Sequence, residues 1–157
     1  MEELSAVSTT LFLVRHGETS FNHRGIYQGH QDIPLNDRGR QQARLVGEKL
    51  KEARCHFLWS SDLSRARETA QIIGQIADLA VHEDRRLREI AFGQWEGRSP
   101  QEIREIWPEE LTKWRTEPET AHVPGGETLL EVVARVMECL DEIAALYPNQ
   151  RGIVVLH

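Results

Sequence analysis

The sequence is poor in cysteine, has no long apolar run and has no excess of basic residues. Its two cysteines, Cys55 and Cys139, lie far apart and outside any Cys-x-x-Cys pattern, so neither a disulfide framework nor a cysteine zinc site is indicated. We expect two buried free thiols. No apolar stretch reaches the length of a membrane span, and the opening residues MEELSAVSTT are acidic and polar, unlike a secretory signal. We therefore expect a cytoplasmic protein without a membrane partner.

The balance of charge also narrows the range of functions. The 19 Lys and Arg residues are outnumbered by 25 Asp and Glu residues, which gives a formal net charge of −6. Nucleic-acid binding depends on clustered basic residues, so we expect no nucleic-acid partner. Any bound phosphate should be a small one, held in a local basic pocket. The length of 157 residues, 39% of them hydrophobic, predicts a single globular domain over residues 1–157.

Apolar residues recur with the spacing of strands that alternate with helices. Strands are predicted at 11–14, 56–60, 80–83 and 152–156, and a long turn-rich loop at 18–34. Helices are predicted to begin at Asn36 or Asp37, at a cap on Ser64, at Ser99, at Glu109 and at Thr128. The two short helices, 99–107 and 109–115, would form a small lid. This alternation predicts an α/β fold with a mostly parallel sheet.

Polar side chains follow several of the predicted strands. They are Arg15 and His16, Ser60, Glu89 and His157. Because the carboxyl ends of parallel strands share one edge of a sheet, these groups can converge. Arg15 disfavours the protonated form of the His16 ring, which leaves a nitrogen lone pair for nucleophilic attack. Arg65 begins a predicted helix, so its guanidinium and the free N–H groups of the first turn can bind an anion.

Two histidines, two arginines and a helix N-terminus suit a tetrahedral phosphoryl group, whose spread charge needs a cationic cage. Other phosphatase designs do not fit, since the sequence has no Asp-x-Asp pair, no Cys-x5-Arg loop and no P-loop motif. His16-Gly17-Glu18 matches the His-x-Glu half of a zinc deaminase signature, but the Pro-Cys-x-x-Cys half is absent. We take that match as accidental and expect no metal site.

The segment 15–19, Arg-His-Gly-Glu-Thr, resembles the R-H-G-[ET] signature of the histidine phosphatase superfamily, also called the phosphoglycerate mutase-like family. The resemblance continues in order along nearly the whole chain. Matching segments are Tyr27-Gln28-Gly29, 60–66 (SSDLSRA), 87–97 (LREIAFGQWEG) and Gly125-Gly126-Glu127. It implies a three-layer sandwich, with helices on both faces of the sheet, and a helical lid.

The resemblance also implies a role for each matching residue. His16 would be the nucleophile that forms a phosphohistidine. Glu89 would donate a proton to the leaving alcohol and then activate the water that hydrolyses the phosphoenzyme. The phosphoryl group would be held by Arg15, Arg65, His157, Asn22, Gln28 and Gly29. Neither a metal nor another cofactor is implied.

The form of the acid motif favours one branch of the family. Residues 87–97 follow the L-x-E-x-x-F/L-G-x-W-E-G pattern of its phosphatases rather than the E-R-x-Y-G type of its cofactor-dependent mutases. We therefore expect a metal-independent phosphomonoester hydrolase that acts on a small phosphorylated substrate, like the α-ribazole-phosphate or phosphoserine phosphatases. A cofactor-dependent phosphoglycerate mutase is the alternative.

Members of the family continue past the second histidine with a helix and more of the sheet. We therefore expect the native chain to extend beyond His157, with the C-terminal part of the fold missing from this sequence. If the protein ended at His157, a catalytically dead phosphate-binding member would be a further alternative. A homodimer is among the assemblies that the sequence allows. Further candidates for substrate contacts are His30, Trp95, Arg98, Arg115 and His122.

Overall fold

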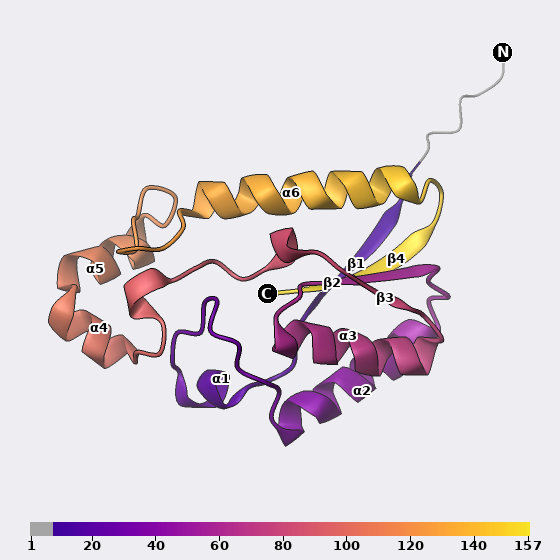
Figure 1. Ribbon diagram of the computed structural model, residues 1–157, viewed down its shortest axis with the longest axis horizontal. Coiled ribbons are helices and arrows are strands. Elements are labelled where there is room, and N and C mark those ends of the chain that lie inside the picture. The colour runs from indigo at the N-terminus through magenta and orange to yellow at the C-terminus, as the bar shows by residue number, and fades with distance from the viewer. Residues whose placement is uncertain (1–7) are drawn as a thin grey trace, which may run out of the picture.

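The computed structural model describes residues 8–157, and within this range four strands form one sheet (Figure 1). The strands are β1 (Thr10–Arg15), β2 (Phe57–Ser60), β3 (Val81–Glu83) and β4 (Arg151–Leu156). Their order is β1-β4-β2-β3, and every neighbouring pair is parallel. The predicted α/β fold with a parallel sheet is confirmed, and all four carboxyl ends lie at the same edge.

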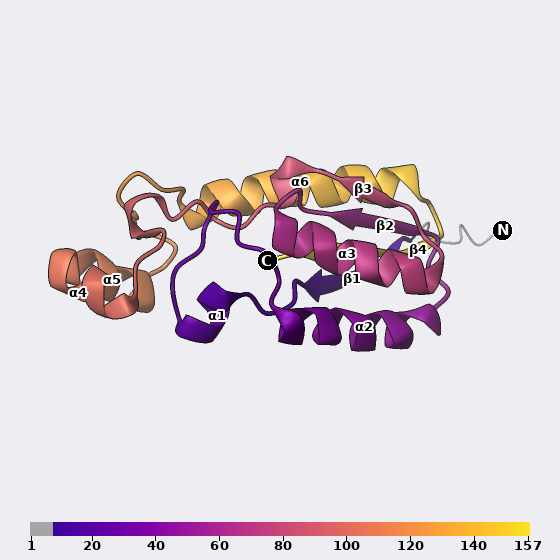
Figure 2. The ribbon, with the colours of Figure 1, turned by 60° about the horizontal axis from the view of Figure 1, so that its bottom comes forward.

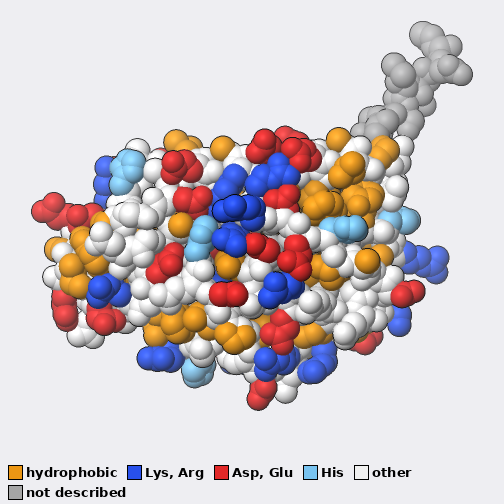
Figure 3. Space-filling view, viewed as in Figure 1, with side chains coloured by type: hydrophobic (Ala, Val, Ile, Leu, Met, Phe, Trp, Pro, Cys, Tyr) orange, Lys and Arg blue, Asp and Glu red, His pale blue; other side chains and the backbone are white. Residues whose placement is uncertain are grey.

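Helices cover both faces of this sheet, as Figure 2 shows. Helix α6 (Leu129–Leu146) packs on one face, and α2 (Asp37–Lys51) and α3 (Ser64–Ala77) pack on the other. The three layers implied by the resemblance are therefore present. On the outer surface, acidic and basic side chains are interspersed over the face seen in Figure 3.

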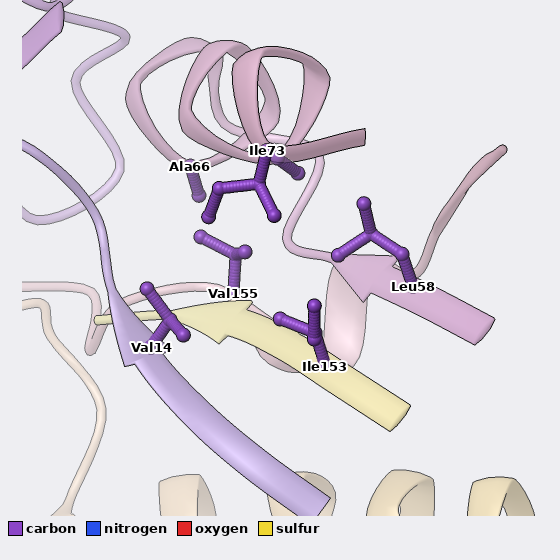
Figure 4. Packing of buried hydrophobic residues seen from close by; sticks show 7 residues of the cluster. Val14, Leu58, Ala66, Ile73, Ile153 and Val155 are labelled. Atoms are coloured by element: carbon purple, nitrogen blue, oxygen red, sulfur yellow. The ribbon is translucent and has the colours of Figure 1, made fainter. Parts of the chain in front are cut away.

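The core lies on both sides of β4, the strand between β1 and β2. Ile153 and Val155 belong to a buried cluster with Ile73 of α3 (Figure 4). Val154 points to the opposite face and belongs to a second cluster with Cys139 of α6. Successive side chains of a strand point to opposite faces, so a strand covered on both sides is apolar throughout. This accounts for the unbroken apolar run at the end of the sequence.

The lid comprises α4 (Pro100–Ile106) and α5 (Pro108–Thr116), which lie at one end of the molecule, away from the sheet (Figure 1). As predicted, Ser99 begins α4 with a capping box, and Pro100 takes the first helical position. The lid has a hydrophobic core of its own. Its buried members are Trp95, Ile103, Leu111 and Val123, and Trp107 and Trp114 pack against them.

Two features of the chain differ from the prediction. Ser64 does not cap α3: it is the first helical residue, and its N–H and hydroxyl both donate to the Asp32 carboxylate at 2.7 Å. The prediction was wrong because the capping group comes from a loop that is distant in sequence. The loop 18–34 also contains a short helix, α1 (Ser20–Arg24), which Thr19 caps. Two 3-10 turns, Arg85–Leu87 and Gly93–Trp95, complete the elements of the described residues.

Both cysteines are free thiols, with Cys139 buried and Cys55 half-buried. Within residues 8–157 no helix combines the length and apolarity needed to cross a membrane. The same part of the chain holds no cluster of three or more His, Cys, Asp or Glu side chains placed to bind a metal ion.

Candidate active site

The sheet brings the two predicted histidines together, although they are far apart in sequence. β1 and β4 are neighbours, with Arg15 paired to Leu156, so His16 and His157 follow adjacent strand ends. The backbone N–H of His16 donates to the carbonyl of Leu156 at 3.0 Å. The centroids of the two imidazole rings are 5.0 Å apart, and the rings are tilted by 57°.

The His16 ring is held as a neutral imidazole with one free lone pair. Its Nδ1 lies 2.7 Å from the carbonyl oxygen of Gly17, and because a carbonyl can only accept, Nδ1 carries the proton. Burial lowers the pKa of His16 from 6.5 to about 4, helped by the positive charges of Arg65 and Arg15 and opposed by the bond to Gly17. At neutral pH the unprotonated Nε2 is thus available as a nucleophile. The sequence argument identified Arg15, but burial is the larger cause.

His157 is also held as a neutral imidazole. Its Nε2 lies 3.0 Å from the hydroxyl oxygen of Ser61, and its Nδ1 is buried without a hydrogen-bond partner among the described residues. Burial, Arg65 and His16 together lower the pKa of His157 to about 2. A buried polar atom without a partner is costly, so Nδ1 marks a place where a ligand atom would be stabilising.

Arg65 is fully buried in the first turn of α3, directly after the carboxyl end of β2. Its two terminal nitrogens donate to the backbone carbonyls of Gln31 at 2.9 Å and Gly29 at 2.8 Å. Its Nε is buried without a hydrogen-bond partner in residues 8–157. Burial lowers the pKa of Arg65 from its usual value, and the nearby carboxylate of Glu89 opposes this. The guanidinium therefore anchors the 25–34 loop and still has its Nε–H donor to offer to an anion.

The turn after His16 is fixed by tight backbone packing and by α1. A Cβ on Gly17 would lie 2.4 Å from the carbonyl oxygen of Gly39, so only glycine fits there. The N–H of Gly17 donates to the hydroxyl of Thr69 at 3.0 Å. Thr19 caps α1 and donates from its N–H to the Asn22 side-chain oxygen at 3.0 Å. This leaves the Asn22 amide nitrogen as its group for ligand binding.

Gln28 and Gly29 have structural contacts within the 25–34 loop that the resemblance did not specify. The side-chain oxygen of Gln28 accepts a hydrogen bond from the Thr19 hydroxyl at 2.6 Å. Gly29 has a φ of +52°, and a Cβ there would lie 2.1 Å from Oε1 of Glu96. The carbonyl of Gly29 anchors Arg65. Gln28 and Gly29 thus both help to hold the 25–34 loop in its conformation around Arg65.

Glu89 is half-buried in the segment after β3 and lies beside Arg65 in electrostatic range. Its Oε1 accepts a hydrogen bond from the N–H of Ile90 at 3.0 Å. The preceding Arg88 forms two hydrogen bonds with Asp62 at 2.7 and 2.6 Å, which ties this segment to the turn after β2. The carboxyl that was predicted as the acid is therefore placed near the arginine that was predicted to bind the anion.

The candidate residues line two cavities. A cavity of about 530 Å³ is lined by Arg15, His16, Asn22 and Thr69, and a smaller apolar one of about 220 Å³ is lined by Glu89 and His157. The ring contact between His16 and His157 links the two groups of residues. The larger cavity is the more polar of the two, and Arg15 supplies positive charge at its wall, so it is the better suited to an anion.

Other residues near the site were missed or misjudged from the sequence. Trp95 is fully buried in the lid core, so it supports the lid rather than contacting a substrate. Arg135 of α6, which contacts the backbone of Glu89, carries no local signal, because nothing in a regular amphipathic helix distinguishes it from a solvent-exposed arginine.

Residues 11–157 match the family model of the histidine phosphatase superfamily (branch 1). The chain is 37% identical over 147 residues to phosphoserine phosphatase 1 of Hydrogenobacter thermophilus, covering 94% of this chain and 70% of that protein. It is 42% identical over 150 residues to phosphoglycerate mutase-like protein 4 of Arabidopsis thaliana, covering 94% of this chain and 65% of that protein.

A solved structure of a mycobacterial glucosyl-3-phosphoglycerate phosphatase with VO3 superimposes with a TM-score of 0.87 at 33% identity, over 96% of this chain and 74% of that chain. The chain spans 65% to 70% of the length of the two curated relatives. The matched segment contains the strand ends that carry both histidines and Arg65. This chain belongs to the histidine phosphatase superfamily.

Proposed function

We propose that the protein is a cytoplasmic, metal-independent phosphomonoester hydrolase that acts on a small phosphorylated metabolite through a phosphohistidine. The observation that carries the proposal is the neutral His16 ring, whose free Nε2 lies beside the His157 ring and the buried Arg65. The phosphatase names of two of the relatives support the hydrolase class.

In the first step, Nε2 of His16 attacks the phosphorus atom and the bond from phosphorus to the ester oxygen breaks. Glu89, protonated, gives its proton to that oxygen, and the alcohol leaves. Positive charge from Arg15 and Arg65 stabilises the equatorial oxygens of the transferring group. The buried Nδ1 of His157 and Nε of Arg65, which have no partner among the described residues, would each donate to one of those oxygens.

In the second step, water attacks the phosphohistidine while the Glu89 carboxylate takes its proton. The bond from Nε2 to phosphorus breaks, inorganic phosphate is released and the His16 lone pair is restored. Glu89 ends protonated and His16 neutral, so the enzyme returns to its starting state. A His16 ring with a pKa of about 4 leaves the phosphoenzyme as the neutral imidazole that the next cycle needs.

The test is turnover of p-nitrophenyl phosphate in EDTA, combined with detection of an acid-labile phosphoenzyme. We expect both to be lost in His16→Ala. The matched control is His23→Ala, because His23 lies on α1 close to the site but is 72% exposed, and we expect it to keep both. Undiminished turnover in His16→Ala would refute the proposal. If the proposal holds, a panel of phosphoserine, α-ribazole phosphate and phosphoglycerates, scored for free phosphate, would identify which of them the wild-type protein hydrolyses.

A phosphoglycerate mutase is the second candidate, favoured by the 42% identity to a protein named as phosphoglycerate mutase-like. A mutase would transfer phosphate between the 2 and 3 positions of a glycerate without net release of inorganic phosphate. A catalytically dead member would instead bind phosphate without turnover or phosphoenzyme at long incubation. The ratio of free phosphate to isomerised product separates the three outcomes.

A further inference from the structure

Arg135, in the middle of α6, binds three backbone carbonyls of the segment that carries Glu89. Its Nη1 donates to the carbonyls of Arg86 and Arg88, each at 2.7 Å, and its Nη2 donates to the carbonyl of Glu89 at 2.9 Å. The remaining two donors, on Nε and Nη2, go to Glu127 at 2.8 Å each. All five N–H donors of the side chain are therefore used.

Glu127 binds the backbone on the C-terminal side of Glu89. Its Oε2 accepts from the N–H of Ala91 at 2.8 Å, and its own N–H donates to the Ala91 carbonyl at 2.9 Å. The hydrogen bonds from Arg135 and the N–H of Ala91 lower the pKa of Glu127, so it stays ionised at neutral pH. The pair Arg135–Glu127 thus holds the backbone both before and after Glu89.

His30, in the 25–34 loop, contacts the same carbonyl of Glu89. Nε2 of His30 lies 2.8 Å from the carbonyl oxygen of Glu89, and the N–H of His30 donates to Glu96 at 2.8 Å. The Glu89 carbonyl thus accepts two hydrogen bonds, one from His30 and one from Arg135. With its Cα restrained from both directions, the Glu89 side chain has little freedom beyond its own torsions.

We propose that Arg135, through Glu127, is a positioning residue for Glu89: it places the carboxyl within reach of the leaving-group oxygen. The inference rests on the proposed phosphatase function. A proton donor works only within hydrogen-bond distance, and a displacement of about 1 Å costs roughly 10²-fold in rate. Arg135 does not contact the nucleophile, so its effect should be confined to the two proton transfers that Glu89 performs, one as acid and one as base.

The leaving group separates this role from a purely structural one. An alkyl phosphate needs its alkoxide protonated as it leaves, whereas dinitrophenolate leaves without a proton. For Arg135→Gln in the full-length protein we expect kcat/KM, which reports formation of the phosphoenzyme, to fall about 10²-fold for an alkyl phosphate. We expect kcat/KM for dinitrophenyl phosphate to fall less than about 3-fold, whereas hydrolysis of the phosphoenzyme, which uses Glu89 as base, should slow equally for both esters. Arg135→Lys, which keeps the charge but not the fork of donors, should show a smaller loss of the same kind.

Arg86→Gln is the matched control. Arg86 also ties this segment to α6, through the hydrogen bond of its side chain to Glu142 at 2.6 Å, and its guanidinium makes no hydrogen bond to Glu89 among the described residues. We expect it to lower the melting temperature without a loss of kcat/KM that depends on the leaving group. If Arg135→Gln does not fold, Arg135→Lys carries the test.

Four results would overturn the inference. Equal losses of kcat/KM on both esters in the Arg135 variants would make the role structural, and a leaving-group effect of the same size in Arg86→Gln would make it nonspecific. Wild-type protein that turns over neither ester and forms no phosphoenzyme would remove the proposed function and the inference together. Active wild-type protein with unchanged Arg135 variants would remove the inference alone.

Discussion

Gly17 and Gly39 lie against each other at the point where the turn after His16 meets the first turn of α2. A Cβ on Gly17 would come within 2.4 Å of the Gly39 carbonyl oxygen, and a Cβ on Gly39 within 2.2 Å of the Glu18 carbonyl oxygen. Real Cβ atoms do not approach backbone so closely. The position of the nucleophile therefore depends on a contact between two residues without side chains.

Gly39→Ala should displace this turn and lower both stability and activity. We expect a loss of about 2 kcal/mol in the free energy of unfolding, measured in urea, and at least a 10-fold loss of kcat/KM. Gly47→Ala, also in α2, is the control, because its Cβ would meet the flexible end of Ile76 at 2.8 Å. A change below about 1 kcal/mol is expected there. Equal effects of the two substitutions would contradict the explanation.

The depressed pKa of His16 should make the protein less stable in acid. The folded pKa is about 4 and the ordinary pKa of histidine is 6.5, so between these values the unfolded chain binds more protons than the folded protein. Stability is fully present above the unfolded pKa and is lost as pH falls toward the folded one. At pH 5 the protein should therefore have lost about 2 kcal/mol of stability, relative to neutral pH, through His16.

His16→Asn removes this titrating group and provides the comparison. Urea unfolding of both proteins between pH 5 and pH 7.5 should show a steeper decline for wild type than for the variant. Parallel curves would mean that His16 has an ordinary pKa in the folded protein. NMR of the imidazole resonances should show His16 unprotonated down to about pH 5.

Arg65→Lys should weaken binding of inorganic phosphate about 10²-fold, measured by calorimetry. A lysine keeps the charge but cannot bridge the two carbonyls of Gly29 and Gln31 while offering a further donor to the anion. Arg40→Lys is the control, because Arg40 pairs with Glu68 on the outer helices and is remote from this loop. Phosphate affinity that survives Arg65→Lys would place the anion elsewhere.

Asp32→Ala should remove the cap of α3, because Asp32 accepts from both the N–H and the hydroxyl of Ser64. We expect the free energy of unfolding to fall by about 1–2 kcal/mol. Asp37→Ala changes a carboxylate that is 97% exposed, and a loss below about 0.5 kcal/mol is expected. Chemical denaturation of the three proteins compares them directly, and equal losses would argue against capping by Asp32.

Much of the fold and the main candidate residues could be predicted because their signals are local. Apolar runs placed the strands, a capping box at Ser99 placed the start of α4, and the helical spacing of apolar residues after Thr128 placed α6. The convergence of His16 and His157 followed from parallel strands sharing one edge. What could not be predicted involves contacts between distant segments, such as Asp32 with Ser64 or Arg135 with the carbonyl of Glu89. Side chains that bind backbone carbonyls leave no pattern in a sequence.

The place of β4 in the sheet has a consequence for how the molecule assembles. Its ladder joins residues 10–15 to residues 151–156 and separates β1 from β2, so the first and last strands must find each other across the whole chain. Such long-range parallel pairing is slow to form. Until β4 inserts, β1 and β2 have open edges that can pair with other chains. During synthesis, His16 and His157 would therefore come together only after all of this sequence has left the ribosome.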